Sequence, residues 1–301
     1  MLRARGPQGR ARRWVMHRRL ALASLLVGSA APLVAQGSYS PGVAVPSRAD
    51  SMLSAGRLAA AERALYTAVD ARPRAPEPRG ALGAYLASRG RFRVAEILFQ
   101  EAQRFGAEPR TVQRAIAVMA PYRVAHPVEP VVAVPISATL DRSALFALRV
   151  RGTRGTRDDM TALLDPSVRG VVLGRAAVAR FAVRAGRVSV DIGARRLEGL
   201  EATVDSLAPP DDLRIGLDVL WGLHPQVDER AGMLILGRPP NLAGIAGQLE
   251  QVPFVLTFPG MLLVPRVGQP PYPLNSREGR ALLRGTRWQI DAATATLAIE
   301  R

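Results

Sequence analysis

Hydrophobic and polar residues alternate differently in three stretches of the chain. An apolar run covers Leu20 to Ala35 without a charged residue. From residue 48 to residue 120, small and larger apolar residues fall on a repeating stripe, as in paired amphipathic helices. From Val131 onward, short runs rich in Val and Leu are separated by turns of Gly, Arg and Asp, which is typical of strands. The pattern predicts a multidomain chain, helical first and then mainly β.

The N-terminal run has the order of a secretory signal, a basic region followed by an apolar one. Its apolar core of about 15 residues is shorter than the roughly 20 that a helix needs to cross a bilayer. We therefore expect cleavage after Ala35, an exported protein in the periplasm or outside the cell, and no stable membrane span. Met16 offers an alternative start of the signal, and residues 36–47 are expected to be a linker. The basic region contains these residues and no acid: Arg3, Arg5, Arg10, Arg12, Arg13, Arg18 and Arg19.

Residues 48–120 contain an internal repeat with a period of 34 residues. Setting Gly56 over Gly90 superposes apolar on apolar and acidic on acidic positions. This spacing resembles tetratricopeptide-like helical hairpins, with Leu82-Gly83 and Pro73 at two of that family's usual places. Arg110 to Ala120 is expected to close the array. The aligned pairs are Leu58 with Phe92, Ala61 with Ala95, Glu62 with Glu96, Leu65 with Phe99, and Ala68 with Ala102.

Two interpretations of this helical segment remain open. It either offers a groove for a partner's peptide through Tyr66 and Tyr85, or these are packing residues and the segment is a spacer. Two units and a closing helix make a short array, so we expect it to be stabilised by packing against the neighbouring domain. Pro121, Pro127, Pro130 and Pro135 then predict a stiff linker over residues 121–135.

The pattern of apolar runs and turn residues from Val131 onward predicts strands, one short helix and one hairpin. The hairpin is expected around Gly193-Ala194. Strands are expected at Ser143–Val150, Met160–Leu164, Val171–Leu173, Arg187–Ile192 and Leu197–Val204, and the helix at Ala176–Phe181.

Within residues 131–238 the chain resembles retropepsin-like aspartic peptidases. Residues 162–173 read ALLDPSVRGVVL, similar to the family pattern ALLDTGAxxSVL, and residues 214–220 read RIGLDVL, similar to ILGLDxL. Val227-Asp228 to Leu236 resembles the family's closing strand pair. The resemblance implies packed antiparallel strands and, in active members, two Asp-Thr-Gly turns whose carboxylates share one proton.

By this resemblance, Asp165 is the candidate catalytic residue, and Pro166, Ser167 and Gly216 are candidate cleft-forming residues. Pro166 replaces the family's Thr and Ser167 its Gly, where backbone passes close to backbone. Arg214 replaces the first of two apolar residues before Gly216. These departures weaken the expectation of catalysis.

Residues 239–301 are expected to be a degenerate second lobe or an extension. Seven positions between Leu220 and Leu236 match positions 63 residues later, among them Gln226 with Gln289 and Asp228 with Asp291. Residues 261–266 also resemble residues 162–167, which places Val264 where the partner of Asp165 would stand. Such a pseudo-dimer would have one catalytic carboxylate.

Two functions follow from the resemblance. The first is a non-catalytic module that binds a peptide or protein by strand addition. The alternative is an active aspartic endopeptidase in which a homodimer brings together two copies of Asp165. Alternatively, Asp165 has only a structural role and caps its own turn. Asp218 and Asp228 are expected to be turn and cap residues.

Charge and composition bear on three further classes of function: nucleic-acid binding, disulfide-stabilised folds and metal binding. The net charge is +16, and removal of residues 1–35 lowers it to about +9. The basic residues are all Arg and form no dense patch with interleaved aromatics, so no nucleic-acid partner is expected. The chain has no Cys and hence no disulfide. His126 and His224 have no partner at metal-ligand spacing, so neither a metal nor another cofactor is expected.

Overall fold

A computed structural model describes residues 47–123, 131–139, 144–152, 159–175, 177–178, 186–205, 213–237, 249–257, 261–291 and 294–301. The predicted signal peptide and the linker residues 36–46 lie outside this set. In the described part, no helix combines the length and the apolar composition that crossing a membrane requires.

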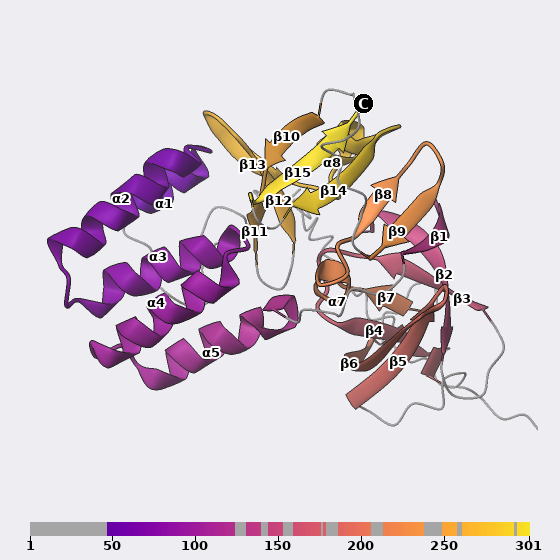
Figure 1. Cartoon of the computed structure of the whole chain (residues 1–301), viewed down its shortest axis with the longest axis horizontal. Coiled ribbons are helices and arrows are strands. Elements are labelled where there is room, and N and C mark those ends of the chain that lie inside the picture. The colour runs from indigo at the N-terminus through magenta and orange to yellow at the C-terminus, as the bar shows by residue number, and fades with distance from the viewer. Residues whose placement is uncertain are drawn as a thin grey trace, which may run out of the picture. The chain divides into compact units, whose positions relative to one another are not determined.

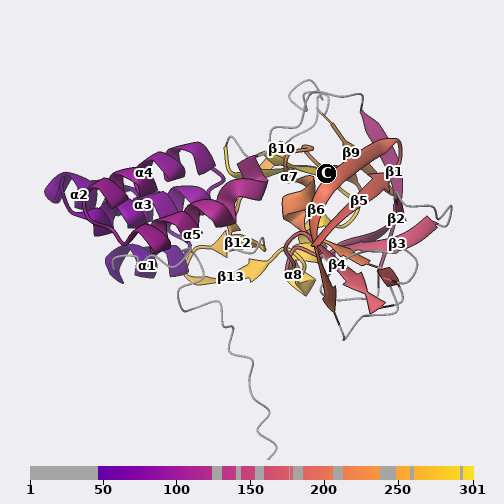
Figure 2. The same cartoon turned by 90° about the horizontal axis from the view of Figure 1, so that it is seen from below.

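The first described part of the chain consists of two helical hairpins followed by a fifth α-helix (Figures 1 and 2). The repeated Gly56 and Gly90 have the same backbone geometry, with φ of 69° and 72°, and each follows the first helix of a hairpin. A left-handed turn of this kind favours Gly because Gly has no Cβ. The helices are Ser47–Ser54 (α1), Leu58–Ala71 (α2), Pro76–Ser88 (α3), Phe92–Arg104 (α4) and Pro109–Met119 (α5), followed by the 3-10 helix Ala120–Arg123 (η2).

Helix α3 is buried along nearly its whole length and has no solvent-facing stripe. Its Tyr85 is 1% exposed and donates its hydroxyl to the carbonyl of Leu58 at 3.2 Å. Tyr66 on α2 is 45% exposed. Of the two tyrosines considered for a peptide groove, Tyr85 is therefore a packing residue.

The rest of the chain is built from strands, most of them in one large sheet. Its order is β10-β15-β14-β8-β9-β1-β2-β3-β7-β4-β6-β5, and a small second sheet has the order β11-β12-β13. The strands are Val132–Ser137 (β1), Phe146–Gly152 (β2), Asp159–Leu164 (β3), Val171–Gly174 (β4), Gly186–Ile192 (β5), Arg195–Asp205 (β6), Leu213–Ile215 (β7), Gln226–Asp228 (β8), Met233–Leu236 (β9), Leu249–Pro253 (β10), Val255–Leu256 (β11), Leu262–Arg266 (β12), Gln269–Pro273 (β13), Arg287–Asp291 (β14) and Thr296–Glu300 (β15).

Strands β2, β3, β7, β4, β6 and β5 form a closed barrel, because β5 also pairs with β2 through Arg151↔Asp191 and Gly152↔Val190. Helices followed mainly by strands, with a β-barrel, are compatible with a retropepsin-like fold. The expected hairpin at Gly193-Ala194 joins β5 to β6. The first expected strand is shifted, because the β2–β3 ladder runs from Phe146↔Leu164 to Arg151↔Asp159. The helix expected at 176–181 falls mostly outside the described residues.

Two short helices each precede a hairpin of the large sheet: Leu217–Trp221 (α7) before β8–β9, and Arg277–Leu283 (α8) before β14–β15. The two hairpins have the same register 63 positions apart, with Val227↔Leu234 in the first and Ile290↔Leu297 in the second. Their outer neighbours also correspond, because Val134 of β1 pairs with Leu234 and Val252 of β10 pairs with Leu297. Six strands of the large sheet therefore form two similar sets of three, β1 with β8–β9 and β10 with β14–β15.

The turns of the two hairpins agree in detail. Asp228 Oδ1 accepts from the amide of Ala231 at 2.9 Å, and Asp291 Oδ1 accepts from the amide of Thr294 at 3.3 Å. The next residues, Gly232 and Ala295, have positive φ of 64° and 55°. Ala295 is a non-glycine residue in a conformation that usually favours Gly.

The two sets meet where β8 pairs with β14, and we call this junction the seam. Gln226 faces Gln289 there, and these are the residues that the 63-position offset makes equivalent. Two antiparallel strands related by a two-fold axis place equivalent residues opposite each other at that axis. The register is therefore that of an approximate two-fold axis through the pair Gln226↔Gln289.

Candidate functional site

Asp165 immediately follows β3 and begins a tight turn. Its amide donates to the carbonyl of Ile215 at 3.0 Å, and its carbonyl accepts from the amide of Val168 at 3.2 Å. Both the amide and the hydroxyl of Ser167 donate to Asp165 Oδ1, at 2.9 and 2.5 Å. Asp165 therefore caps its own turn, and Ser167 contributes a hydroxyl contact two residues later.

The other carboxylate oxygen of Asp165 forms an ion pair with Arg214, whose Nη1 lies 2.5 Å from Oδ2. The Asp165 side chain is fully buried, whereas the Arg214 side chain is 18% exposed. Parallel pairing of β3 with β7, through Leu163↔Arg214 and Leu164↔Ile215, places the two residues side by side. A carboxylate in this environment is held by a cation and two hydrogen-bond donors.

The far end of the turn is fastened to α7. Gly216 donates its amide to the Gly170 carbonyl at 2.8 Å, and the amide of Gly170 donates to both carboxylate oxygens of Asp218 at 3.0 Å. A Cβ on Gly216 would overlap the carbonyl of Val168 and the Asp218 side chain, so no larger residue fits. Burial raises the pKa of Asp218, although the Gly170 amide opposes this. Asp218 thus has a structural part in the site.

The structure brings Asp165, Pro166, Ser167 and Gly216 together around one turn. The residue aligned with Asp165 in the second half, Val264, has no carboxylate. Val264 lies within β12, pairs with Tyr272 and is 3% exposed. The chain turns only later, at Val267-Gly268. The equivalence of Val264 with Asp165 remains a prediction, and at this position the chain has an apolar strand residue.

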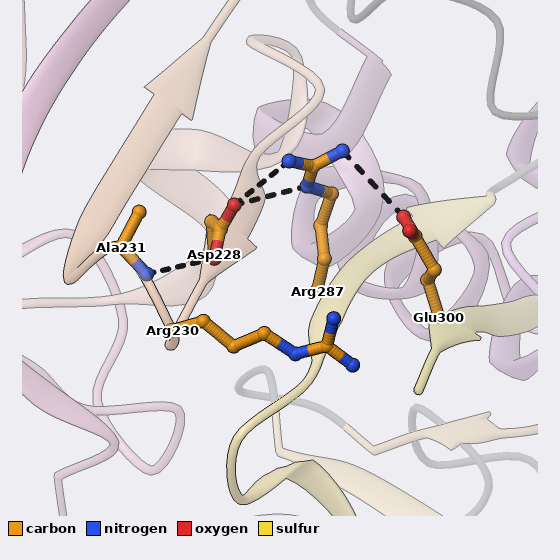
Figure 3. Close-up of a pocket in the computed structure, with 5 residues that line it drawn as sticks. All are labelled: Asp228, Arg230, Ala231, Arg287 and Glu300. Carbon is orange, nitrogen blue, oxygen red and sulfur yellow. Dashed lines mark hydrogen bonds and ion pairs between the residues drawn. The ribbon is translucent and has the colours of Figure 1, made fainter. Parts of the chain in front are cut away.

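A pocket of about 320 Å³ opens at the seam, away from Asp165 (Figure 3). Arg287 of β14 binds Asp228 of β8 through Nη2 at 2.9 Å and Glu300 of β15 through Nη1 at 3.5 Å. Partial burial acts to raise the pKa of Asp228, but the Ala231 amide and the Arg287 guanidinium together hold that pKa below its usual value. Arg287 thus pairs with Asp228 across the seam, and Arg230 donates to the Gly285 carbonyl at 2.7 Å, which indicates a structural role for these charges.

Sequence reasoning identified Asp165 but missed its ion-pair partner. The signal was present, because Arg214 stands where the resembled pattern has an apolar residue. An Arg beside a tight turn that carries an Asp is a candidate ion pair, and the parallel β3–β7 register makes the contact possible. No group of three or more His, Cys, Asp or Glu in the described segments is arranged to hold a metal ion.

Solved structures with a similar fold include a protease. A retropepsin-like aspartic protease from Rickettsia conorii is similar at 15% sequence identity, with a TM-score of 0.28, over 36% of this chain and 90% of that one. No protein-family model matches the chain, and no curated protein does.

Proposed function

We propose that this chain is an exported, non-catalytic module that binds a peptide or protein on a retropepsin-like β-fold. The observation that carries the proposal is the state of Asp165, which is fully buried and paired with Arg214. The resemblance of residues 162–173 and 214–220 to retropepsin-like peptidases supports the fold class in this proposal, and the activity is argued from the site itself.

Catalysis of this type needs two carboxylates that share a proton, so that one activates water while the other donates the proton. The guanidinium of Arg214 contacts one carboxylate oxygen of Asp165, and the Ser167 hydroxyl and amide donate to the other. A carboxylate that is already bound to a guanidinium and to the Ser167 hydroxyl is a poor base for water. The geometry therefore supports binding over hydrolysis.

The second part of the proposal concerns residues 239–301, which we interpret as a degenerate second lobe. The repeated register of β14–β15 and the turn shared by Asp228 and Asp291 support a common origin for the two halves. The second half has the short hairpin β12–β13 in the place where the resemblance would put a second Asp turn. One catalytic carboxylate would then be missing within the chain.

The alternative is an endopeptidase that obtains its second Asp165 from another copy of the chain. Such a dimer, if joined through the same seam, would use the outer edge of β8. That edge pairs with β14 of the same chain through Asp228↔Arg287, Val227↔Trp288 and Gln226↔Gln289. A second copy would have to displace β14 together with the ion pairs of Arg287, which favours the non-catalytic proposal.

The first experiment incubates the full chain with a library of unfolded peptides between acid and neutral pH, beside the Asp165→Asn variant. We expect no cleavage that depends on Asp165. Cleavage by the wild-type chain that disappears in Asp165→Asn, with both proteins folded by circular dichroism, would establish the peptidase and overturn the proposal.

The second experiment locates binding. Peptides retained by the full chain are added back, and amide hydrogen exchange is measured with and without them. We expect slower exchange in residues 165–170 and 213–216. Protection confined to α2 and α4 would place the binding face on the helices, and absence of any retained peptide would contradict a peptide-binding module.

A further inference from the structure

We propose that the inner face of the helical array α1–α5 is a docking surface whose partner is the second half of this same chain, residues 249–301. The array would then act as an internal clamp and would not present this face to another protein. This inference does not depend on whether the barrel binds peptides.

The first helix of each hairpin contacts a different element of the β-rich part. Helix α1 contacts β13 and α3 contacts β11, both in the second half, whereas η2, which follows α5, contacts α7 in the first half. In a stacked array of helical hairpins the first helices share one face. That face is therefore directed at the chain's own strands, and α3 is buried for this reason as well as by its helical neighbours.

The closest approach lies between the α1–α2 turn and the β12–β13 hairpin. The amide of Gly268 donates to the carbonyl of Ala55 at 3.1 Å. Beside it, a Cβ on Gly56 would overlap the carbonyl of Arg266. Gly56 is thus required twice, once by its positive φ and once by the backbone that passes over it.

A second contact joins α3 to the β14–β15 turn. Arg89 Nη2 donates to the carbonyl of Ala295 at 3.2 Å, and the Arg89 guanidinium lies over the ring of Phe254 at 5.9 Å. Ala295 has the unusual positive φ of the turn. The array thus supports the second half at two separate turns.

Four aromatic rings connect the array with both halves of the β-rich part. Phe92 of α4 and Tyr122 of η2 contact Trp221 of α7 at centroid distances of 5.9 and 5.5 Å, and Trp221 contacts Phe254 at 6.0 Å. All four side chains are at most 6% exposed. This continuous aromatic contact is typical of a domain core and not of a transient interface.

The three-stranded sheet β11-β12-β13 also needs a cover on each side. Leu262, Leu263 and Val264 are consecutive in β12 and are 0, 1 and 3% exposed. Successive strand residues point to opposite faces, so both faces of this strand are covered. Strand β10 and helix α8 contact the sheet from within the second half, and α1 and α3 contact it from the array.

The test compares Gly56→Ala with Gly106→Ala in the full chain. Both glycines have positive φ, 69° and 103°, but a Cβ on Gly106 would meet no atom within 4 Å. The control therefore introduces at least as much backbone strain in the same array, because its φ lies farther outside the left-handed region, and it does not touch the β12–β13 hairpin. Amide hydrogen exchange is measured across the chain in both variants.

We expect Gly56→Ala to speed exchange in residues 262–273 by up to about tenfold, the change expected when one hydrogen bond is lost. Gly106→Ala should leave exchange in that segment unchanged. If Gly56→Ala fails to fold, Arg89→Met replaces it, and faster exchange is expected in residues 287–300. Unchanged exchange in both β segments, with effects confined to the helices, would overturn the internal clamp.

Discussion

The ion pair between Arg214 and Asp165 makes a direct prediction for the variant Arg214→Leu, which restores an apolar residue at this position. Deleting one partner of a buried ion pair typically destabilises a protein by roughly 3–5 kcal/mol. The Arg214 side chain is 18% exposed, so the pair is partly screened by solvent. We therefore expect a loss near the lower end, about 3 kcal/mol in the free energy of unfolding.

The opposite deletion should cost less. In Asp165→Asn the buried side chain is neutral and keeps an acceptor for Ser167, while Arg214 reaches water. We expect a loss of about 1.5–3 kcal/mol, the range for one hydrogen bond to a charged group. The double variant completes a cycle, and its loss should be smaller than the sum of the two single losses because both remove the same interaction.

The measurement is urea-induced unfolding at pH 7, followed by circular dichroism, with equal m-values required for comparison. Arg196→Leu is the matched control, because Arg196 forms an ion pair with Asp191 at 3.0 Å while its side chain is 56% exposed. This exposed pair should contribute at most about 1 kcal/mol. If Arg214→Leu were no more destabilising than Arg196→Leu, Asp165 would not be held by Arg214, and the main support for a non-catalytic site would be lost.

Three further predictions follow from the same structure. Burial raises the pKa of Asp218 in the folded chain, so the free energy of unfolding falls as the pH rises from the unfolded pKa through the folded pKa. Urea unfolding should therefore show Asp218→Asn gaining relative to wild type as the pH rises above about 4, and a constant difference would contradict this. Because β14 fills the outer edge of β8, light scattering should give a monomer, and a dimer would revive the shared-dyad alternative. Trp221→Ala should lower the unfolding free energy by roughly 3–5 kcal/mol, whereas Tyr66→Ala at an exposed site should stay within about 0.5 kcal/mol; equal losses would show that the aromatic junction does not stabilise the chain.

Features set by local or periodic patterns could be predicted from the sequence. The Gly56 and Gly90 turns were found by their period, because a left-handed turn after a helix requires Gly in each copy. The 63-position offset likewise anticipated the hairpins, since equal spacing of apolar residues between two turns imposes equal register. Ser143–Val150 was placed too early because the pairing partner, Leu164 of β3, decides where β2 begins.

Features that depend on distant contacts could not be predicted. Arg214 and Asp165 are 49 residues apart, and only the parallel register of β3 and β7 brings them together. The burial of α3 was likewise invisible, because a helix covered on every side has no polar stripe to reveal which neighbours cover it. The sequence therefore does not distinguish a packing role of Tyr85 from a role in peptide binding. Its exposure of 1% in the structure shows that it is a packing residue.

The two sets of strands are alike in register and in their hairpin turns. No second Asp turn equivalent to that of Asp165 is found by the sequence alignment of the two halves. The seam keeps Gln226 opposite Gln289, and the two flanking hairpins keep their register and their Asp-capped turns. Strand pairing depends on this agreement, because a slip of one residue would turn every buried side chain to the other face. The Asp165 turn is under no such constraint from the seam, and the proposed alignment of the second half would put Val264 of the buried strand β12 opposite Asp165 in sequence. A binding module of the kind proposed above requires agreement in strand register and does not require a second Asp turn.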